Sequence, residues 1–243
     1  MSRTPDSPGR VILGATSFAD AESALGYAIA LARRLNGELM GLLIEEETFI
    51  ACSAGRGTQA VMAHVGRSTQ LSEDAMRAAY RRDARAFRQR LEQAALGNAL
   101  RWSFAIRQGR APLLLAQAAE AGDLVILGYR AAPVDAGHVT AVMGATLDRD
   151  MLARAADLAR ESGRGLSILA PAVLGDSVTA AATRLGIPAR LIAADGLAAL
   201  LHRLNRLHAA IVFLGEDSVP SGSLSAVVAA ARAPVVLPAR AAR

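Results

Sequence analysis

The chain has 243 residues, which corresponds to one large domain or two small ones at about 150 residues per domain. Its 52% hydrophobic and 20% charged residues exclude a mainly disordered chain. The longest uncharged run, residues 218–231, is too short to span a bilayer. All 27 basic residues are arginine, so enzymes that need a Schiff-base lysine, a Walker A lysine or a kinase strand lysine are excluded.

Residues 1–9 are polar and contain two prolines, so we expect a flexible tail rather than a signal peptide, and a cytoplasmic protein. Cys52 is the only cysteine, which excludes an internal disulfide and a multi-cysteine metal site. The arginines are scattered among 22 acidic residues with few aromatics, so no nucleic-acid partner is expected despite the formal charge of +5. The four histidines share no metal-ligand spacing, and no metal is expected.

The first elements predict a parallel sheet. Residues 10–16 are a continuous apolar run, which is typical of a strand buried on both faces. Residues 19–36 then show helical spacing of apolar positions, and residues 38–44 form a second apolar run. This β-α-β order requires a right-handed crossover between parallel strands.

The chain between residues 45 and 70 has no steady hydrophobic period and predicts a long loop or lid. We expect it to pack over the crevice of the first unit through Phe49, Ile50, Val61 and Met62, where a nucleotide would otherwise lie.

The regular pattern resumes at Ser72, where a long amphipathic helix begins. A strand over 100–107, a turn over 108–112, a helix over 113–121 and a buried strand over 123–128 follow.

The second half repeats this order of elements. Residues 139–146 end in the same Gly-Ala-Thr triplet as residues 14–16, which aligns Gly14 with Gly144. Further strands are expected at 165–170, 189–193 and 209–215, with helices at 151–160 and 223–232 and a last strand at 234–238. We therefore expect two fused units, residues 10–137 and 138–243, of which the first lacks the last helix and strand.

These residues together resemble the universal stress protein family, a flavodoxin-like α/β fold of the adenine-nucleotide-hydrolase type. The segments that carry the resemblance are the first strand and turn at 11–17, Leu-Ala-Arg-Arg at 31–34, the turn at 108–112, Ala-Gly-Asp-Leu-Val-Ile-Leu-Gly at 121–128, and Gly222-Ser223. The resemblance implies an α/β fold of two fused, mainly parallel units.

The resemblance also implies where a nucleotide would bind, and the sequence departs from that pattern. Nucleotide-binding members carry an aspartate at the end of the first strand, a position that falls on Ala15 and Gly144, and a glycine loop after the fourth strand. Here the second glycine of that loop is missing, and two acids, Glu216 and Asp217, follow the second copy of the strand. The candidate cofactor-binding residues that remain are Thr16, Ser17, Gly128, Tyr129, Arg130, Gly222 and Ser223.

We therefore expect a non-catalytic binding or regulatory protein of the stress response with a degenerate nucleotide site and no bound cofactor. Its expected partner is another protein or a second copy of itself. An enzyme is not expected, because no acid–base pair, metal cluster or lysine is placed to carry chemistry. The alternative is a stress switch that binds ATP through Thr16, Ser17, Gly128 and Arg130 of the first unit.

Overall fold

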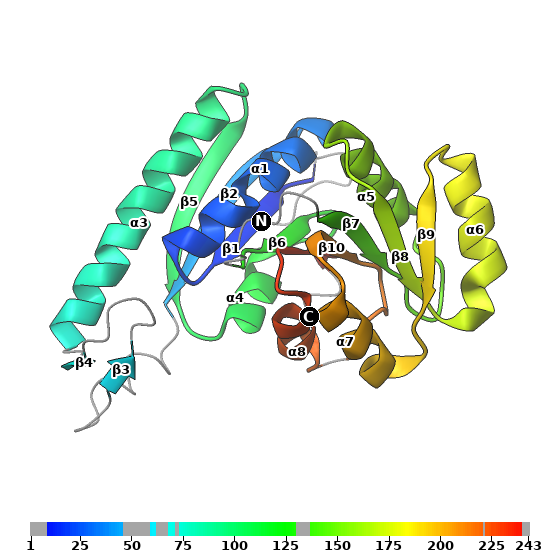
Figure 1. Cartoon of the computed structure of the whole chain (residues 1–243). Helices are drawn as coiled ribbons and strands as arrows, with labels where there is room; N and C mark the ends of the chain where they lie inside the picture. Colours follow the sequence, from blue (N-terminus) through cyan, green and yellow to red (C-terminus); the bar gives the residue numbers. More distant parts are fainter. Residues whose placement is uncertain are drawn as a thin grey trace.

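The computed structural model describes residues 9–45, 59–61, 68–70, 73–129, 137–220 and 222–239. In these residues nine strands form one twisted sheet with helices on both faces (Figure 1). The predicted tail up to residue 8, Phe49, Ile50, Met62 and the side chain of Val61 lie outside the described part, so the predicted lid over the first crevice stays a prediction. No described helix is long and apolar enough to cross a membrane.

The first half of the sheet is parallel, as predicted. Its strands are β1 (Val11–Ala15), β2 (Glu38–Glu45), β5 (Arg101–Gln108) and β6 (Leu124–Leu127), and its helices are α1 (Phe18–Arg34), α3 (Glu73–Leu96) and α4 (Ala111–Ala118). β1 lies between β2 and β6, and β5 is the outer strand beside β2. Within the segment predicted as an irregular loop, β3 (Gln59–Val61) and β4 (Ser68–Gln70) instead pair as a separate antiparallel two-stranded sheet.

The second half has the same strand order around its first strand. The strands are β7 (His138–Val142), β8 (Leu166–Ala170), β9 (Ala189–Ala193), β10 (Ala209–Leu214) and β11 (Val235–Pro238), and the helices are α5 (Arg149–Glu161), the short 3-10 helix η1 (Ala172–Leu174), α6 (Gly175–Arg184), α7 (Gly196–Arg206) and α8 (Leu224–Ala231). β7 lies between β8 and β10, as β1 lies between β2 and β6. Helices α6 and α7 were not predicted from the sequence pattern.

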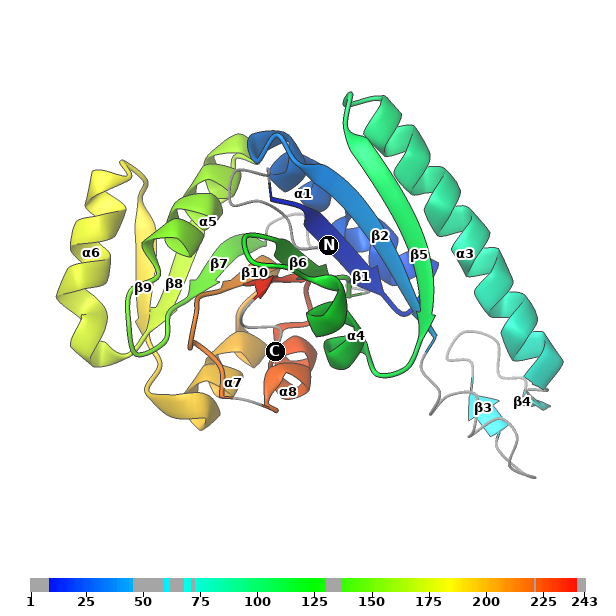
Figure 2. The ribbon, with the colours of Figure 1, turned by 180° about the vertical axis from the view of Figure 1, so that it is seen from behind.

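The last strand, β11, joins the two halves into one sheet (Figure 2). It runs parallel to β10 and antiparallel to β6, so that Val236 pairs with both Phe213 and Ile126. The first half has no such fifth strand of its own in its described residues. Because the halves run in opposite directions across β11, the carboxyl ends of their strands lie at opposite edges of the sheet.

The helices bury the two faces of the sheet in two apolar layers. α1, α3, α5 and α6 cover one face, where Phe87 of α3 packs edge-to-face on Phe104 of β5 with ring centroids 5.3 Å apart. α4, α7 and α8 cover the other, where Leu115, Leu204 and Val227 are buried. Every residue of β1 is buried, which explains why its sequence is a continuous apolar run rather than an alternating one.

The strand pairing shows that one predicted alignment between the halves is wrong. The backbone N–H of Gly128 donates to the carbonyl of Gly14, and that of Gly215 donates to the carbonyl of Val142. Gly128 thus corresponds to Gly215, whereas Gly14 corresponds to Val142 and not, as predicted, to Gly144. The shared Gly-Ala-Thr triplet misled the alignment, because the turn from β7 to α5 is longer than the turn from β1 to α1.

Candidate functional site

At the edge of the first half, the polar groups between β1 and α1 bind one of the chain's own carboxylates. Oγ1 of Thr16 and Oγ of Ser17 donate to Oδ2 of Asp20 over 3.0 Å and 2.6 Å. Ser17 is the N-cap of α1, and its Oγ accepts the backbone N–H of Asp20. Both predicted hydroxyls are therefore engaged by an acid.

A second carboxylate reaches the same helix end from α3. Oδ2 of Asp83 accepts the backbone N–H of Phe18 over 3.0 Å. Ser17 and Asp83 thus accept backbone N–H groups at the N-terminus of α1. The carboxylates of Asp20 and Asp83 are the kind of negative group that the helix dipole favours there.

Gly128 and Tyr129 close this edge against α1. A Cβ on Gly128 would lie 2.5 Å from the carbonyl oxygen of Asp20, so only glycine allows the approach. Oγ of Ser23 lies 2.7 Å from the carbonyl oxygens of both Tyr129 and Asp20 and donates across this contact. The structure brings Thr16, Ser17, Gly128 and Tyr129 together, whereas Arg130 lies outside the described residues.

Substituting Gly128 tests how tightly this edge is closed. Gly128→Ala is expected to lower the free energy of unfolding by about 1–3 kcal/mol, because the added methyl group meets backbone atoms that cannot rotate away. Gly26→Ala, in an exposed position of α1 with open space around it, is the control and should raise stability by roughly 0.5–1 kcal/mol. If chemical denaturation gave the same change in the free energy of unfolding for both variants, the close approach of Gly128 to the backbone of α1 would be contradicted.

At the opposite edge, Asp148 ties the loop after β10 to α5. As the N-cap of α5, its Oδ1 accepts the backbone N–H of Met151 over 2.9 Å. Its Oδ2 accepts the backbone N–H of Glu216 over 3.0 Å. At this edge an acid holds a backbone donor in the loop after β10, whereas the acids of the first edge hold groups between β1 and α1.

Gly222 and Ser223 belong to this second edge and do not meet the four residues of the first. Gly222 has a φ of 82°, a conformation that favours glycine, and leads into α8. Ser223 is the N-cap of α8, but its side chain makes no capping bond, and its N–H donates to the carbonyl of Pro220. The described members of the predicted set therefore lie at two edges, four at the first and Gly222 and Ser223 at the second.

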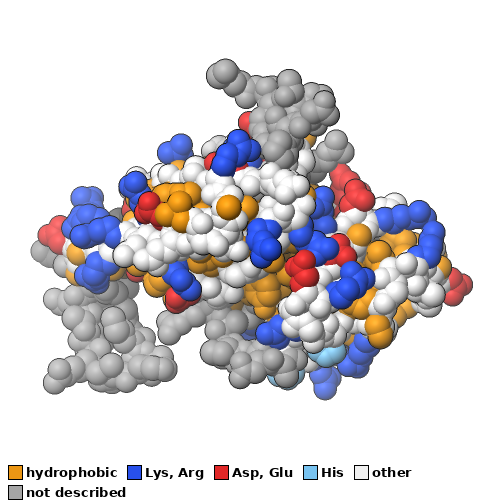
Figure 3. Space-filling model, turned by 90° about the horizontal axis from the view of Figure 1, so that it is seen from above, with side chains coloured by type: hydrophobic (Ala, Val, Ile, Leu, Met, Phe, Trp, Pro, Cys, Tyr) orange, Lys and Arg blue, Asp and Glu red, His pale blue; other side chains and the backbone are white. Residues whose placement is uncertain are grey.

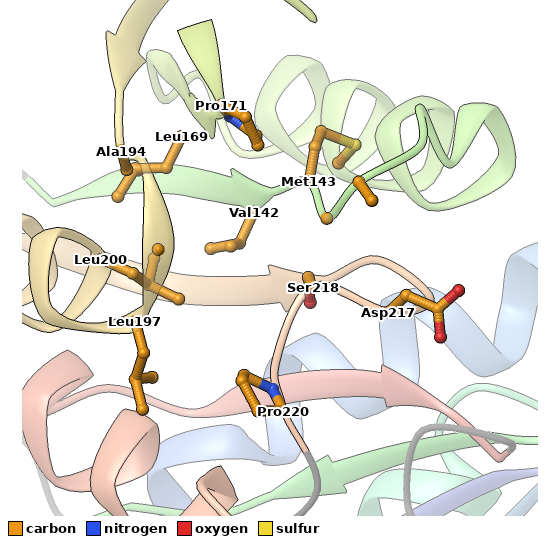
Figure 4. Close-up of a pocket in the computed structure, with 13 residues that line it drawn as sticks. Val142, Met143, Leu169, Pro171, Ala194, Leu197, Leu200, Asp217, Ser218 and Pro220 are labelled. Carbon is orange, nitrogen blue, oxygen red and sulfur yellow. The ribbon is translucent and has the colours of Figure 1, made fainter. Parts of the chain in front are cut away.

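The second edge also contains a small cavity that the sequence analysis did not identify (Figure 4). Its volume is about 240 Å³. It is lined by the ends of β7 and β8, the start of α7 and the loop after β10: Val142, Met143, Gly144, Ala145, Leu169, Pro171, Ala194, Gly196, Leu197, Leu200, Asp217, Ser218 and Pro220. The Oγ of Ser218 is buried and has no hydrogen-bond partner in the part of the chain that the structure describes. No cluster of three metal-ligating side chains occurs among the described residues.

Comparisons with known proteins give a likeness of fold. No protein-family model matches the chain, and no curated protein matches it. A universal stress protein from Archaeoglobus fulgidus DSM 4304 aligns with a TM-score of 0.55 and 12% identity over 96% of this chain and 96% of that one. A protein from the universal stress protein family from Burkholderia pseudomallei aligns with a TM-score of 0.30 and 12% identity over 77% of this chain and 98% of that one. The chain therefore shares the α/β fold of the Archaeoglobus protein.

Proposed function

We propose that this chain is a universal-stress-like binding or regulatory protein without catalytic activity, and that it does not bind ATP. The observation that carries the proposal is that carboxylates of the chain occupy the donors at both sheet edges. Asp20 holds the hydroxyls of Thr16 and Ser17, and Asp148 holds the N–H of Glu216.

Repulsion between like charges opposes the binding of a triphosphate at these positions. Two like charges 4 Å apart repel by about 4 kcal/mol at an effective dielectric constant of roughly 20. A phosphate that approached Asp20 or Asp148 would meet this repulsion and would also have to displace hydrogen bonds already made. Hydrogen bonds from the remaining donors to a phosphate would be too weak to offset both the charge repulsion and the loss of the existing hydrogen bonds.

The two-half architecture supports a role in binding other proteins. We interpret the halves as repeats related by a pseudo-twofold axis near β11, which supplies both with one shared strand. On the face seen in Figure 3, arginine and acidic side chains are interspersed rather than gathered into one basic area. This mixed charge favours a protein partner or a second copy of the chain over a nucleic acid.

Titration of the full chain with ATP and Mg²⁺ tests the proposal. Isothermal titration calorimetry is expected to show no saturable heat at millimolar nucleotide, and phosphate release should stay at the level of the protein-free blank. Asp20→Asn removes one charge from the first edge and Asp148→Asn removes one from the second, so the two variants test the edges independently. A dissociation constant below about 1 mM for the unmodified protein would contradict the proposal.

The same titration places a site if one exists. Binding that is lost in Gly128→Val but kept in Gly222→Val would assign ATP to the first half and establish the alternative of a nucleotide-dependent switch. Both variants need a folded far-UV circular dichroism spectrum before their titrations are compared, because Gly128 packs against backbone.

A further inference from the structure

We propose that the cavity at the second edge binds a small uncharged aromatic molecule of one or two rings that carries one hydrogen-bonding group. The inference rests on the proposed function, because it assigns a ligand to a region from which phosphate is excluded. It concerns only the second half, where the ends of β7 and β8 leave a hollow beneath α7 (Figure 4).

The lining of the cavity fits an apolar ligand. Its side chains are mainly aliphatic, from Val142 and Leu169 on the strands to Leu197 and Leu200 on α7. Asp217 is the only charged residue among the described residues that line it, and its side chain stands on the side away from Leu197 and Leu200 (Figure 4). No arginine is among these described lining residues, so none of them offers a counter-charge to an anionic ligand.

The size of the cavity limits the ligand to one or two rings. An apolar cavity of about 150 Å³ is large enough for benzene, whereas sites for drug-sized ligands begin at about 300 Å³. At about 240 Å³ this cavity lies between these sizes. A two-ring heteroaromatic molecule fits that volume.

Ser218 supplies the polar element of the site. Its hydroxyl oxygen is buried without a partner among the described residues, and a buried polar group in that state is costly. Ser218 is itself one of the residues that line the cavity, and its hydroxyl has other staggered positions open to it. An N–H or O–H group on the ligand would then give it the missing partner.

The walls of the cavity are firmly placed. A Cβ on Gly144 would collide with the carbonyl oxygen of Asp217, so the loops after β7 and β10 are in close backbone contact. Asp148 joins the second of these loops to α5 through Glu216. A site with fixed walls loses less entropy when a small ligand binds.

Binding of indole and of 1-methylindole to the full chain tests the proposal. Saturation-transfer NMR and calorimetry are expected to show saturable indole binding with a dissociation constant below about 1 mM. Ser218→Ala should weaken indole binding roughly threefold to tenfold and leave 1-methylindole, which has no N–H, unchanged. Ser225→Ala, an exposed position of α8, is the matched control.

A filled cavity provides the second arm of the test. Ala194→Phe should abolish binding of both indoles, whereas Ala193→Phe, at the exposed neighbouring residue, should not. If Ala194→Phe does not fold by circular dichroism, Leu197→Phe, at a partly exposed lining position, replaces it.

The outcomes separate this inference from the proposed function. Failure of both indoles to bind, with no ATP binding either, would overturn the cavity assignment alone. Adenosine that binds more tightly than indole and displaces it would also overturn the assignment. ATP binding that leaves bound indole in place would overturn the proposed function and leave the assignment standing.

Discussion

Replacing Asp123 by alanine is expected to lower the free energy of unfolding by about 3–5 kcal/mol, because it leaves a partly buried cation and two backbone donors without their partner. The side chain of Asp123 is 0% exposed and that of Arg10 is 19% exposed, and Nη2 of Arg10 lies 2.7 Å from Oδ2 of Asp123. The same carboxylate accepts the backbone N–H groups of Arg10 and Glu120. It therefore fixes the start of β1 to the turn before β6.

The arginine of this ion pair should keep its charge under ordinary alkaline conditions. The hydrogen bond to Asp123 raises the pKa of Arg10, against an opposing effect of desolvation. A raised pKa of a basic group contributes stability that is fully present below the pKa of the unfolded state and is lost only as the pH rises through the folded value. For arginine both values lie beyond ordinary alkaline conditions.

Asp157→Ala is the matched control for Asp123→Ala. Asp157 pairs with Arg34 between α5 and α1, but both side chains are about one-third exposed. Such a pair contributes at most about 1 kcal/mol. Urea denaturation of the two variants measures the difference, and a loss below 1 kcal/mol for Asp123→Ala would contradict the structural importance of the buried pair.

Leu237→Ala in β11 is expected to lower the free energy of unfolding by about 2–5 kcal/mol. Leu237 is fully buried, pairs with Val125 of β6 and packs in the layer beneath α4, α7 and α8. The cavity left by the substitution weakens the strand that holds the two halves together. Differential scanning calorimetry or urea denaturation measures the loss.

Leu191→Ala provides the same substitution on the outer strand β9, where the side chain is 40% exposed. Leu191→Ala should lower the free energy of unfolding by less than half as much as Leu237→Ala.

Trp102 lies in β5, so its fluorescence reports on the first half, whereas far-UV circular dichroism reports on both. Because β11 pairs with both halves, the two signals should follow a single transition, and separate transitions would contradict the shared-strand account.

The central strands β1 and β6 were predictable because they are buried on both faces. Residues 10–16 and 123–128 stand out as short apolar runs, and the structure places β1 and β6 within one or two residues of them. α7 was missed although Leu197, Leu200 and Leu204 follow helical spacing. The antiparallel partner of β11 had no local signal, since that pairing joins residues more than a hundred positions apart.

The candidate site was predicted only in part. Ser17 and Asp20 follow the pattern of a capping box, so the engagement of Ser17 could have been read from the spacing. The bond from Glu216 to Asp148 joins residues 68 positions apart, and no motif indicates it. The cavity beside Ser218 depends on how two loops meet, which a single sequence does not specify.

The most direct test of the closed sheet edges follows the backbone amides themselves. In ¹H–¹⁵N correlation spectra of the full chain, the amide signals of Gly128, Gly215, Glu216 and Phe18 should not move when ATP and Mg²⁺ are added to several millimolar. We expect this because the N–H groups of Glu216 and Phe18 are bonded to Asp148 and Asp83 and those of both glycines to strand carbonyls. Saturable shifts of these signals, with Asp20→Asn or Asp148→Asn tightening the binding, would show that phosphate reaches the edges and would contradict the account.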